Sequence, residues 1–198
     1  MTFFVNLFQD YTIISFNDSP DLSRGAGINV YRGCEHGCVY CYARTTHEYL
    51  SLSAGLDFET KIFVKPDAPK LLYKKLASKN WEPQKLMLSG NTDPYQPIEK
   101  KLKLTRQCLE VLREFRNPVD IVTKNNLVTR DIDILSDLAE YNASAVFLSV
   151  TTLDNKLASV MEPRTSKPHL KFKAIEALAE SGIPAGVMIA PVIPGLTD

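Results

Sequence analysis

The sequence lacks the features of a secreted or membrane-spanning protein. Its most apolar stretch, residues 182–196, is interrupted by three prolines and is shorter than the roughly 20 apolar residues that a transmembrane helix requires. Residues 1–16 contain Phe, Ile and Val but no basic leader of the kind that precedes a secretory signal. We therefore expect a cytoplasmic protein with no membrane partner.

The chain also has a formal net charge of zero, because 23 basic residues balance 23 acidic ones. No overall field therefore favours nucleic acid or an anionic membrane as a partner. The lysines between positions 61 and 85 form a basic stretch, which a solvated helix face explains more simply than contact with phosphates. With 44% hydrophobic residues, the 198-residue chain has the composition of a globular domain with a substantial core.

Cysteines are too few and too clustered for a disulfide framework. Of the four, Cys34, Cys38 and Cys41 fall within eight positions, whereas Cys108 is distant and lies on the apolar face of a predicted helix. Cys108 is therefore expected in the core. The clustering of the other three favours metal binding in a reducing compartment.

The loop Cys34-Glu-His-Gly-Cys38-Val-Tyr-Cys41 allows three thiolates to face a single inorganic core. Soft thiolates favour iron–sulfur clusters or zinc. A cubane cluster usually takes four cysteines, so three would leave one iron open to a substrate or cofactor. The alternative is a Cys3His zinc site with His36 or His47 as the fourth ligand. Structural zinc usually joins two separated ligand pairs, and the sequence has no second pair.

Strand and helix patterns alternate along the chain. The predicted strands cover residues 27–31, 86–89, 119–123, 145–151 and 187–192. The predicted helices cover residues 67–78, 104–115, 131–141 and 168–181. Residues 44–65 show no clear period. Near-continuous apolar strands alternating with helices indicate an α/β fold with a parallel sheet of about five strands, which suits a β/α barrel or an open part of one.

The expected organisation is an irregular N-terminal segment, residues 1–26, followed by a core over residues 27–198. The sequence stops directly after the fifth predicted strand, with no helix to cover it. We therefore expect that the C-terminal part of the barrel is missing and that the chain is truncated.

The cysteine loop resembles that of the radical SAM superfamily, whose hallmark is Cys-x3-Cys-x2-Cys with an aromatic residue before the last cysteine, here Tyr40. The resemblance implies a partial (β/α)6-type barrel and a [4Fe–4S] cluster on Cys34, Cys38 and Cys41. It further implies that S-adenosylmethionine (SAM) binds the open iron and is cleaved reductively. The resulting 5′-deoxyadenosyl radical would abstract hydrogen from a substrate that the sequence does not identify. The electron donor would be of the flavodoxin or ferredoxin type.

The resemblance also assigns SAM contacts to strand ends. Gly90, Asn91, Thr92 and Asp93 match the segment that binds the SAM amino group, with an ordinary turn as the alternative. Lys124 matches a lysine that meets the SAM carboxylate in the spore photoproduct lyase branch, with a solvated surface lysine as the alternative.

Four further positions carry weaker assignments. Ser149 and Thr151 lie two apart and so share a strand face, where the superfamily binds ribose, although hydroxyls satisfied inside the barrel fit as well. Ile193 matches the segment that packs on adenine, with a core role as the alternative. Tyr42 matches a tyrosine that relays hydrogen, although a packed aromatic is the simpler explanation.

Two polar residues lie outside these assignments. His36, between the cysteines, is expected to hydrogen-bond a sulfur or the backbone, and Arg164 is expected to form a surface ion pair.

The resemblance is strongest to bacterial proteins related to spore photoproduct lyase or DNA repair photolyase, with one departure. In spore photoproduct lyase a hydrogen-donating cysteine lies two residues before the position of Thr92, and here Gly90 stands there. Thymine-dimer repair by that route is therefore not implied, and DNA is only weakly supported as a substrate. Two other hypotheses stay open: a nucleic-acid-binding repair module with a structural metal, and a non-catalytic gene fragment.

Overall fold

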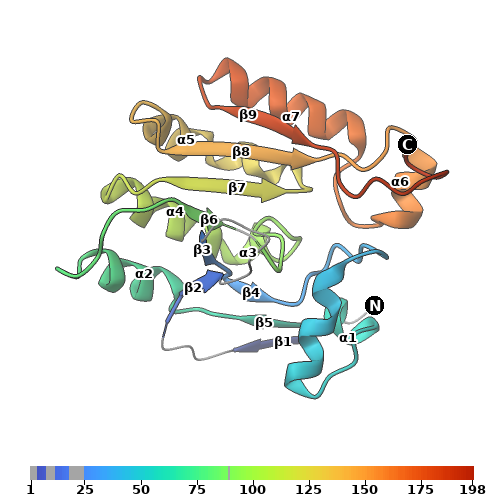
Figure 1. Cartoon of the computed structure of the whole chain (residues 1–198), viewed down its shortest axis with the longest axis horizontal. Coiled ribbons are helices and arrows are strands. Elements are labelled where there is room, and N and C mark those ends of the chain that lie inside the picture. Colours follow the sequence, from blue (N-terminus) through green and yellow to red (C-terminus); the bar gives the residue numbers. More distant parts are fainter. Residues whose placement is uncertain (1–3, 8–11, 18–24, 89) are drawn as a thin grey trace.

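The computed structural model describes residues 4–7, 12–17, 25–88 and 90–198 (Figure 1). Its central feature is a six-stranded sheet with strand order β2-β3-β6-β7-β8-β9. The strands are β2 Ile14–Asn17, β3 Gly25–Ile28, β6 Leu86–Leu88, β7 Val119–Thr123, β8 Ser144–Ser149 and β9 Ala185–Met188. Only β2 runs antiparallel to its neighbour, and the other five strands are parallel. The predicted α/β fold, a partial barrel with five parallel strands, is confirmed.

A second, three-stranded sheet lies beside the first and was not predicted. It has the order β1-β5-β4 and consists of β1 Phe4–Leu7, β5 Lys61–Val64 and β4 Tyr31–Arg32. Residues 1–26 were predicted to be irregular, and this is wrong for β1, for β2 and for the first residues of β3. The predicted strand 27–31 is in fact divided, because β3 pairs with β6 whereas β4 pairs with β5. The chain therefore changes sheets just before it enters the cysteine loop.

The four predicted helices are present, with ends that differ by a few residues from the prediction. They are α2 Ala68–Leu76, α4 Leu104–Glu114, α5 Ile132–Ala139 and α7 Pro168–Glu180. Shorter helical segments lie between them: η1 Tyr42–Leu50, α1 Leu56–Thr60, α3 Glu99–Leu102, η2 Asn126–Asp131 and α6 Asn155–Met161. Among the described residues, none of these helices has the length and apolar character needed to cross a membrane.

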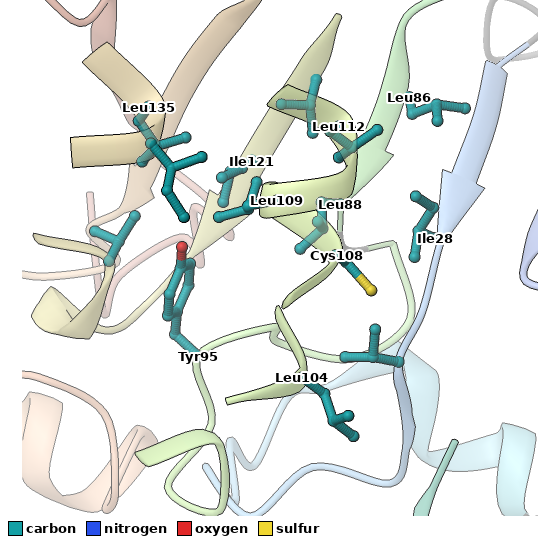
Figure 2. Close-up of a cluster of buried hydrophobic side chains, with 14 of the residues drawn as sticks. Ile28, Leu86, Leu88, Tyr95, Leu104, Cys108, Leu109, Leu112, Ile121 and Leu135 are labelled. Atoms are coloured by element: carbon teal, nitrogen blue, oxygen red, sulfur yellow. The ribbon is translucent and has the colours of Figure 1, made fainter. Parts of the chain in front are cut away.

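The main core lies between the central sheet and α4 (Figure 2). Ile28, Leu88 and Ile121 on three neighbouring strands are at most 1% exposed, and Leu109 on α4 is fully buried. Cys108, also on α4, is 0% exposed and belongs to the same cluster, which confirms its predicted core role.

The carboxyl ends of the parallel strands share one edge of the central sheet, which is where ligand groups gather in parallel β/α folds. Lys124 directly follows β7 at this edge, and Thr151 comes shortly after β8. The fifth strand was predicted over residues 187–192, but β9 covers Ala185–Met188, so it begins two residues earlier and ends four residues earlier than predicted. Strand β9 lies at one edge of this sheet, and among the described residues β8 is the strand that pairs with it.

Candidate metal centre and its supporting network

The three clustered cysteines lie in a loop that is fixed by backbone contacts to distant segments. Cys34 and Cys38 are each 7% exposed, and Cys41 is half-buried. The Cys34 N–H donates to the carbonyl of Phe58 on α1 at 2.9 Å, and the loop's Val39 N–H donates to a carbonyl at the end of α6 at 3.0 Å. All three thiols are free of disulfides. The loop is therefore held in place without any bond between its sulfurs.

The electrostatic surroundings of these thiols suit a positively charged partner. Burial, reinforced by the neighbouring Cys34, raises the pKa of Cys38 far above its ordinary value, although Lys124 acts in the opposite direction. Burial likewise raises the pKa of Cys41. Because metals bind thiolates, the binding of a metal would supply the positive charge that these buried sulfurs need in order to ionise.

His47, one of the two candidate zinc ligands, is 1% exposed, and its ring packs edge-on against Phe58, with ring centroids 5.1 Å apart. Its Nε2 donates to the carbonyl oxygen of Lys61 at 3.1 Å, which leaves Nδ1 as the nitrogen able to coordinate a metal. Within the described parts of the chain, no three His, Cys, Asp or Glu side chains converge as a single ion would require. These contacts give no support to the zinc alternative.

His36 lies inside the cysteine loop and is 1% exposed. Its Nδ1 is 3.3 Å from Asp93 Oδ2, close enough for an ion pair although not aligned for a hydrogen bond. Burial acts to lower the pKa of His36, but the charges of Asp93 and Cys34 outweigh it and raise the value to about 10. A protonated His36 would stabilise a neighbouring thiolate, in line with its expected role beside the sulfurs.

Asp93 connects the loop after β6 with the end of β7. Its Oδ1 accepts hydrogen bonds from the Thr123 hydroxyl at 2.7 Å and the Tyr95 N–H at 2.9 Å. Its Oδ2 accepts from the Lys124 N–H at 2.7 Å. Both carboxylate oxygens are thus engaged within the protein, so the structure gives Asp93 a supporting position. Its contact with SAM stays a prediction.

The other residues of the predicted amino-group segment are held by Asn29, which the sequence reasoning missed. Asn29 Oδ1 accepts from the N–H groups of Asn91 at 3.2 Å and Thr92 at 3.4 Å. The Thr92 hydroxyl donates to the carbonyl of Tyr31 at 3.0 Å. Gly90 has φ of 129°, a backbone conformation that other residues rarely adopt. One signal for Asn29 was present: a lone amide side chain between the apolar residues of a strand.

Tyr42 approaches this same loop from the cysteine side. Its side chain is 73% exposed, and its hydroxyl donates to the carbonyl of Gly90. The structure therefore brings Tyr42 to the predicted SAM-binding loop. Its predicted role in hydrogen relay stays untested.

A buried carboxylate, Glu162, unites three of the predicted site residues. Lys124 Nζ lies 3.1 Å from its Oε1, and the Thr151 hydroxyl donates to the same oxygen at 2.7 Å. The Tyr40 hydroxyl donates to it as well. Lys171 Nζ lies 2.9 Å from Oε2. Burial acts to raise the pKa of Glu162, but the two lysines outweigh it and lower the value to about 2. Glu162 is therefore charged at neutral pH.

The remaining predicted residues, Ser149 and Ile193, come at and after the ends of the last two strands. Ser149, at the end of β8, is 4% exposed, and its hydroxyl makes no hydrogen bond within the described residues. Ile193 is half-buried in the final turn, where its N–H donates to the Thr197 hydroxyl at 2.7 Å. Their assignments to ribose and adenine stay predictions.

Three residues, Arg44, Glu59 and Arg164, form what we call the arginine clamp around the cysteine loop. Arg44 Nε and Nη2 donate to the carbonyl of Cys38 at 3.1 and 3.0 Å, and Nη2 also lies 3.3 Å from Glu59 Oε1. The Arg164 guanidinium contacts the Glu35 carbonyl and the Glu59 carboxylate. The expectation of a surface ion pair for Arg164 is therefore wrong, because its carboxylate partner lies at the cysteine loop and is 8% exposed.

Gly37, between the first two cysteines, lets the clamp approach closely. Its φ is 69°, in the left-handed region. A Cβ at this position would lie 2.1 Å from Arg164 Nη2 and 2.5 Å from Glu59 Oε2. The loop conformation and the clamp therefore both require glycine here.

Comparisons with known proteins show the family and the fold of the chain. Residues 28–198 match the Radical SAM superfamily. An uncharacterized protein of Mycobacterium tuberculosis is 36% identical over 171 residues, which is 86% of this chain and 50% of that protein. One from Methanocaldococcus jannaschii is 32% identical over 171 residues, covering 86% of this chain and 61% of that protein. The chain thus spans between half and two thirds of the length of these relatives.

Solved structures show the same fold. Spore photoproduct lyase complexed with dinucleoside spore photoproduct superimposes with a TM-score of 0.68 at 20% identity, over 96% of this chain and 52% of that one. A mutant of the same enzyme with bound AdoMet and dinucleoside spore photoproduct gives a TM-score of 0.61 at 20% identity, over 94% and 50% of the two chains. With the sequence match over residues 28–198, these findings show that the chain belongs to the radical SAM superfamily.

Proposed function

We propose that this chain holds a [4Fe–4S] cluster on Cys34, Cys38 and Cys41 and uses it to cleave SAM reductively. The observation that carries the proposal is a loop, fixed by backbone contacts, with three free thiols, two of them buried, in a chain whose fourth cysteine is fully buried on α4. Cys108 therefore cannot close the cluster, and one iron stays open to SAM. The chemistry that the cluster supplies when bound is the electron that breaks the sulfur–C5′ bond, giving methionine and a 5′-deoxyadenosyl radical.

The chain's own residues would bind and orient SAM. Lys124 would present a cation to the SAM carboxylate at the end of β7, and the Ser149 hydroxyl, for which the described residues supply no partner, would be available to the ribose. The segment that begins at Gly90 would meet the amino group, and Ile193 would contact adenine. The positions of Lys124 and Ser149 at the carboxyl ends of the neighbouring parallel strands β7 and β8 support this proposal.

Anaerobic reconstitution with iron and sulfide tests this function. We expect about four irons per chain and, after chemical reduction in the presence of SAM, release of 5′-deoxyadenosine that chromatography detects. A loaded and reduced protein that forms no 5′-deoxyadenosine would contradict the activity. Anaerobically purified protein that contains zinc in place of iron would contradict the cofactor.

We propose an electron donor of the flavodoxin or ferredoxin type, and the substrate class is open. The basic stretch does not favour nucleic acid as a partner. Lys61 lies 3.0 Å from Asp57, and Lys85 lies 3.1 Å from Asp120, so both lysines already have carboxylate partners. These two ion pairs reduce the free positive charge of the stretch, and we propose the enzyme in preference to a nucleic-acid-binding module.

The arginine clamp gives a separate prediction. Glu59→Gln removes the charge that both guanidinium groups share, so the cysteine loop should hold iron less firmly. The loss of a charged hydrogen-bond partner of this kind costs about 1.5 kcal/mol, which corresponds to roughly tenfold faster transfer of iron to a chelator. Transfer is followed by the absorbance of the iron–chelator complex. Glu48→Gln, on the exposed face of η1, is the matched control and should lose iron at the unmutated rate. Equal rates for both variants would show that the clamp does not support the loop.

A further inference from the structure

Two lysines share the single carboxylate of Glu162. Lys124 Nζ lies 3.1 Å from Oε1, and Lys171 Nζ lies 2.9 Å from Oε2. Because each lysine has its own oxygen, the carboxylate can lose one of them and stay paired with the other.

The two lysines differ in access to solvent. The Lys171 side chain, on α7, is 2% exposed, as is that of Glu162. The Lys124 side chain, at the end of β7, is 18% exposed, and its Nζ lies 5.4 Å from the centre of the Tyr40 ring. An anion that enters from the strand ends can therefore reach Lys124, whereas Lys171 stays enclosed behind it.

The contacts of Glu162 allow Lys124 to leave. Without Lys124, the carboxylate would retain the ion pair with Lys171 at 2.9 Å and the hydrogen bond from Thr151 at 2.7 Å, together with the Tyr40 hydroxyl. Glu162 would then be paired with one lysine, Lys171. Without Lys171, the departure of Lys124 would leave a buried carboxylate with no cation, which is the costly arrangement for a buried charge.

We propose that Lys124 exchanges Glu162 for the carboxylate of an incoming ligand, and that Lys171 is a positioning residue that keeps Glu162 paired during this exchange. The ligand is SAM, so the inference rests on the proposed function. Lys171 itself does not contact the ligand. The exchange replaces one lysine–carboxylate pair by another, so no proton is transferred and no covalent bond changes.

Equilibrium binding to the cluster-loaded chain tests this exchange, with SAM and decarboxylated SAM as the two ligands. In Lys171→Met, Glu162 should retain Lys124, so the Kd for SAM should rise roughly tenfold or more. The Kd for decarboxylated SAM should change less than about twofold, because that ligand does not need the lysine. Lys173→Met, an exposed lysine on the same helix, is the matched control and should leave both Kd values unchanged.

A double variant separates positioning from simple structural damage. In Glu162→Gln with Lys171→Met, Lys124 has no competing carboxylate, so SAM affinity should return to the unmutated value or exceed it. Equal weakening of both ligands by Lys171→Met, or no recovery in the double variant, would overturn the exchange. If the unmutated chain binds no SAM, the proposed function is wrong, and so is this inference, which depends on it. Normal SAM binding that is insensitive to Lys171→Met overturns the inference alone.

Discussion

Cys38→Ala is expected to abolish both iron retention and the formation of 5′-deoxyadenosine. Cys38 is 7% exposed and lies between the other two cysteines in the loop, so no other thiol can replace it. With two cysteines left, a second iron would lose its protein ligand. We expect less than about a tenth of the unmutated iron content after anaerobic desalting, and no product above the level without enzyme. Iron analysis and chromatography measure the two quantities.

Cys108→Ala is the matched control for this loss. Cys108 is fully buried in the core, away from the loop, so its removal should lower the free energy of unfolding by about 1–2 kcal/mol and leave the iron content intact. A Cys38→Ala protein that keeps a full cluster would contradict the ligand assignment. So would a Cys108→Ala protein that folds but loses its iron.

Glu162→Gln is expected to give the largest loss of stability among single substitutions at the site. It leaves Lys124 and Lys171 without their shared carboxylate, and the Lys171 side chain is 2% exposed. Removal of one partner from a buried ion pair costs about 3–5 kcal/mol. Denaturant unfolding of the metal-free protein measures this loss. The control is Glu176→Gln, on the exposed side of α7, which should change the free energy by less than about 0.5 kcal/mol.

The effect of Glu162→Gln on the free energy of unfolding should depend on pH. The folded-state pKa of Glu162 is lowered from 4.5 to about 2 by its two lysines, against the effect of burial. A depressed carboxyl pKa adds stability that is fully present above the unfolded value, near 4.5, and is lost as the pH falls towards 2. The difference in unfolding free energy between the unmutated chain and Glu162→Gln should therefore narrow below pH 4.5. A difference that stays constant from pH 6 to pH 3 would show that the charge of Glu162 is not what stabilises the fold.

Local patterns in the sequence were sufficient for the cysteine loop and for most of the parallel sheet. The strand Val119–Thr123 was predicted with its observed bounds, because it is a segment rich in β-branched residues between a proline and a polar turn. The second sheet was missed for an equally physical reason. Its strands are two to four residues long, and they are stabilised by pairing between β1, β4 and β5, which are distant in the sequence.

The residues that support the site could not be found from spacing. Glu162 lies 122 positions from Tyr40, and Arg164 lies 105 positions from Glu59. Glu162 and Arg164 flank a proline, and Glu59 lies on the short helix α1. Charged side chains in such places are usually exposed to solvent. Only the tertiary fold shows that these charges are paired around the cysteine loop. Asp93 illustrates the opposite case, since its position near the site was predicted but its engagement with Thr123 and Lys124 was not.

The anchoring of the cysteine loop indicates whether the fold would persist after oxidative loss of the iron. Small zinc domains lose their fold with their metal, because the metal supplies the folding free energy. Here Phe58, the clamp and the end of α6 hold the loop through contacts that involve no metal. We therefore expect a chain that has lost its iron through oxidative damage to stay folded. Iron and sulfide could then rebuild the cluster without synthesis of new protein.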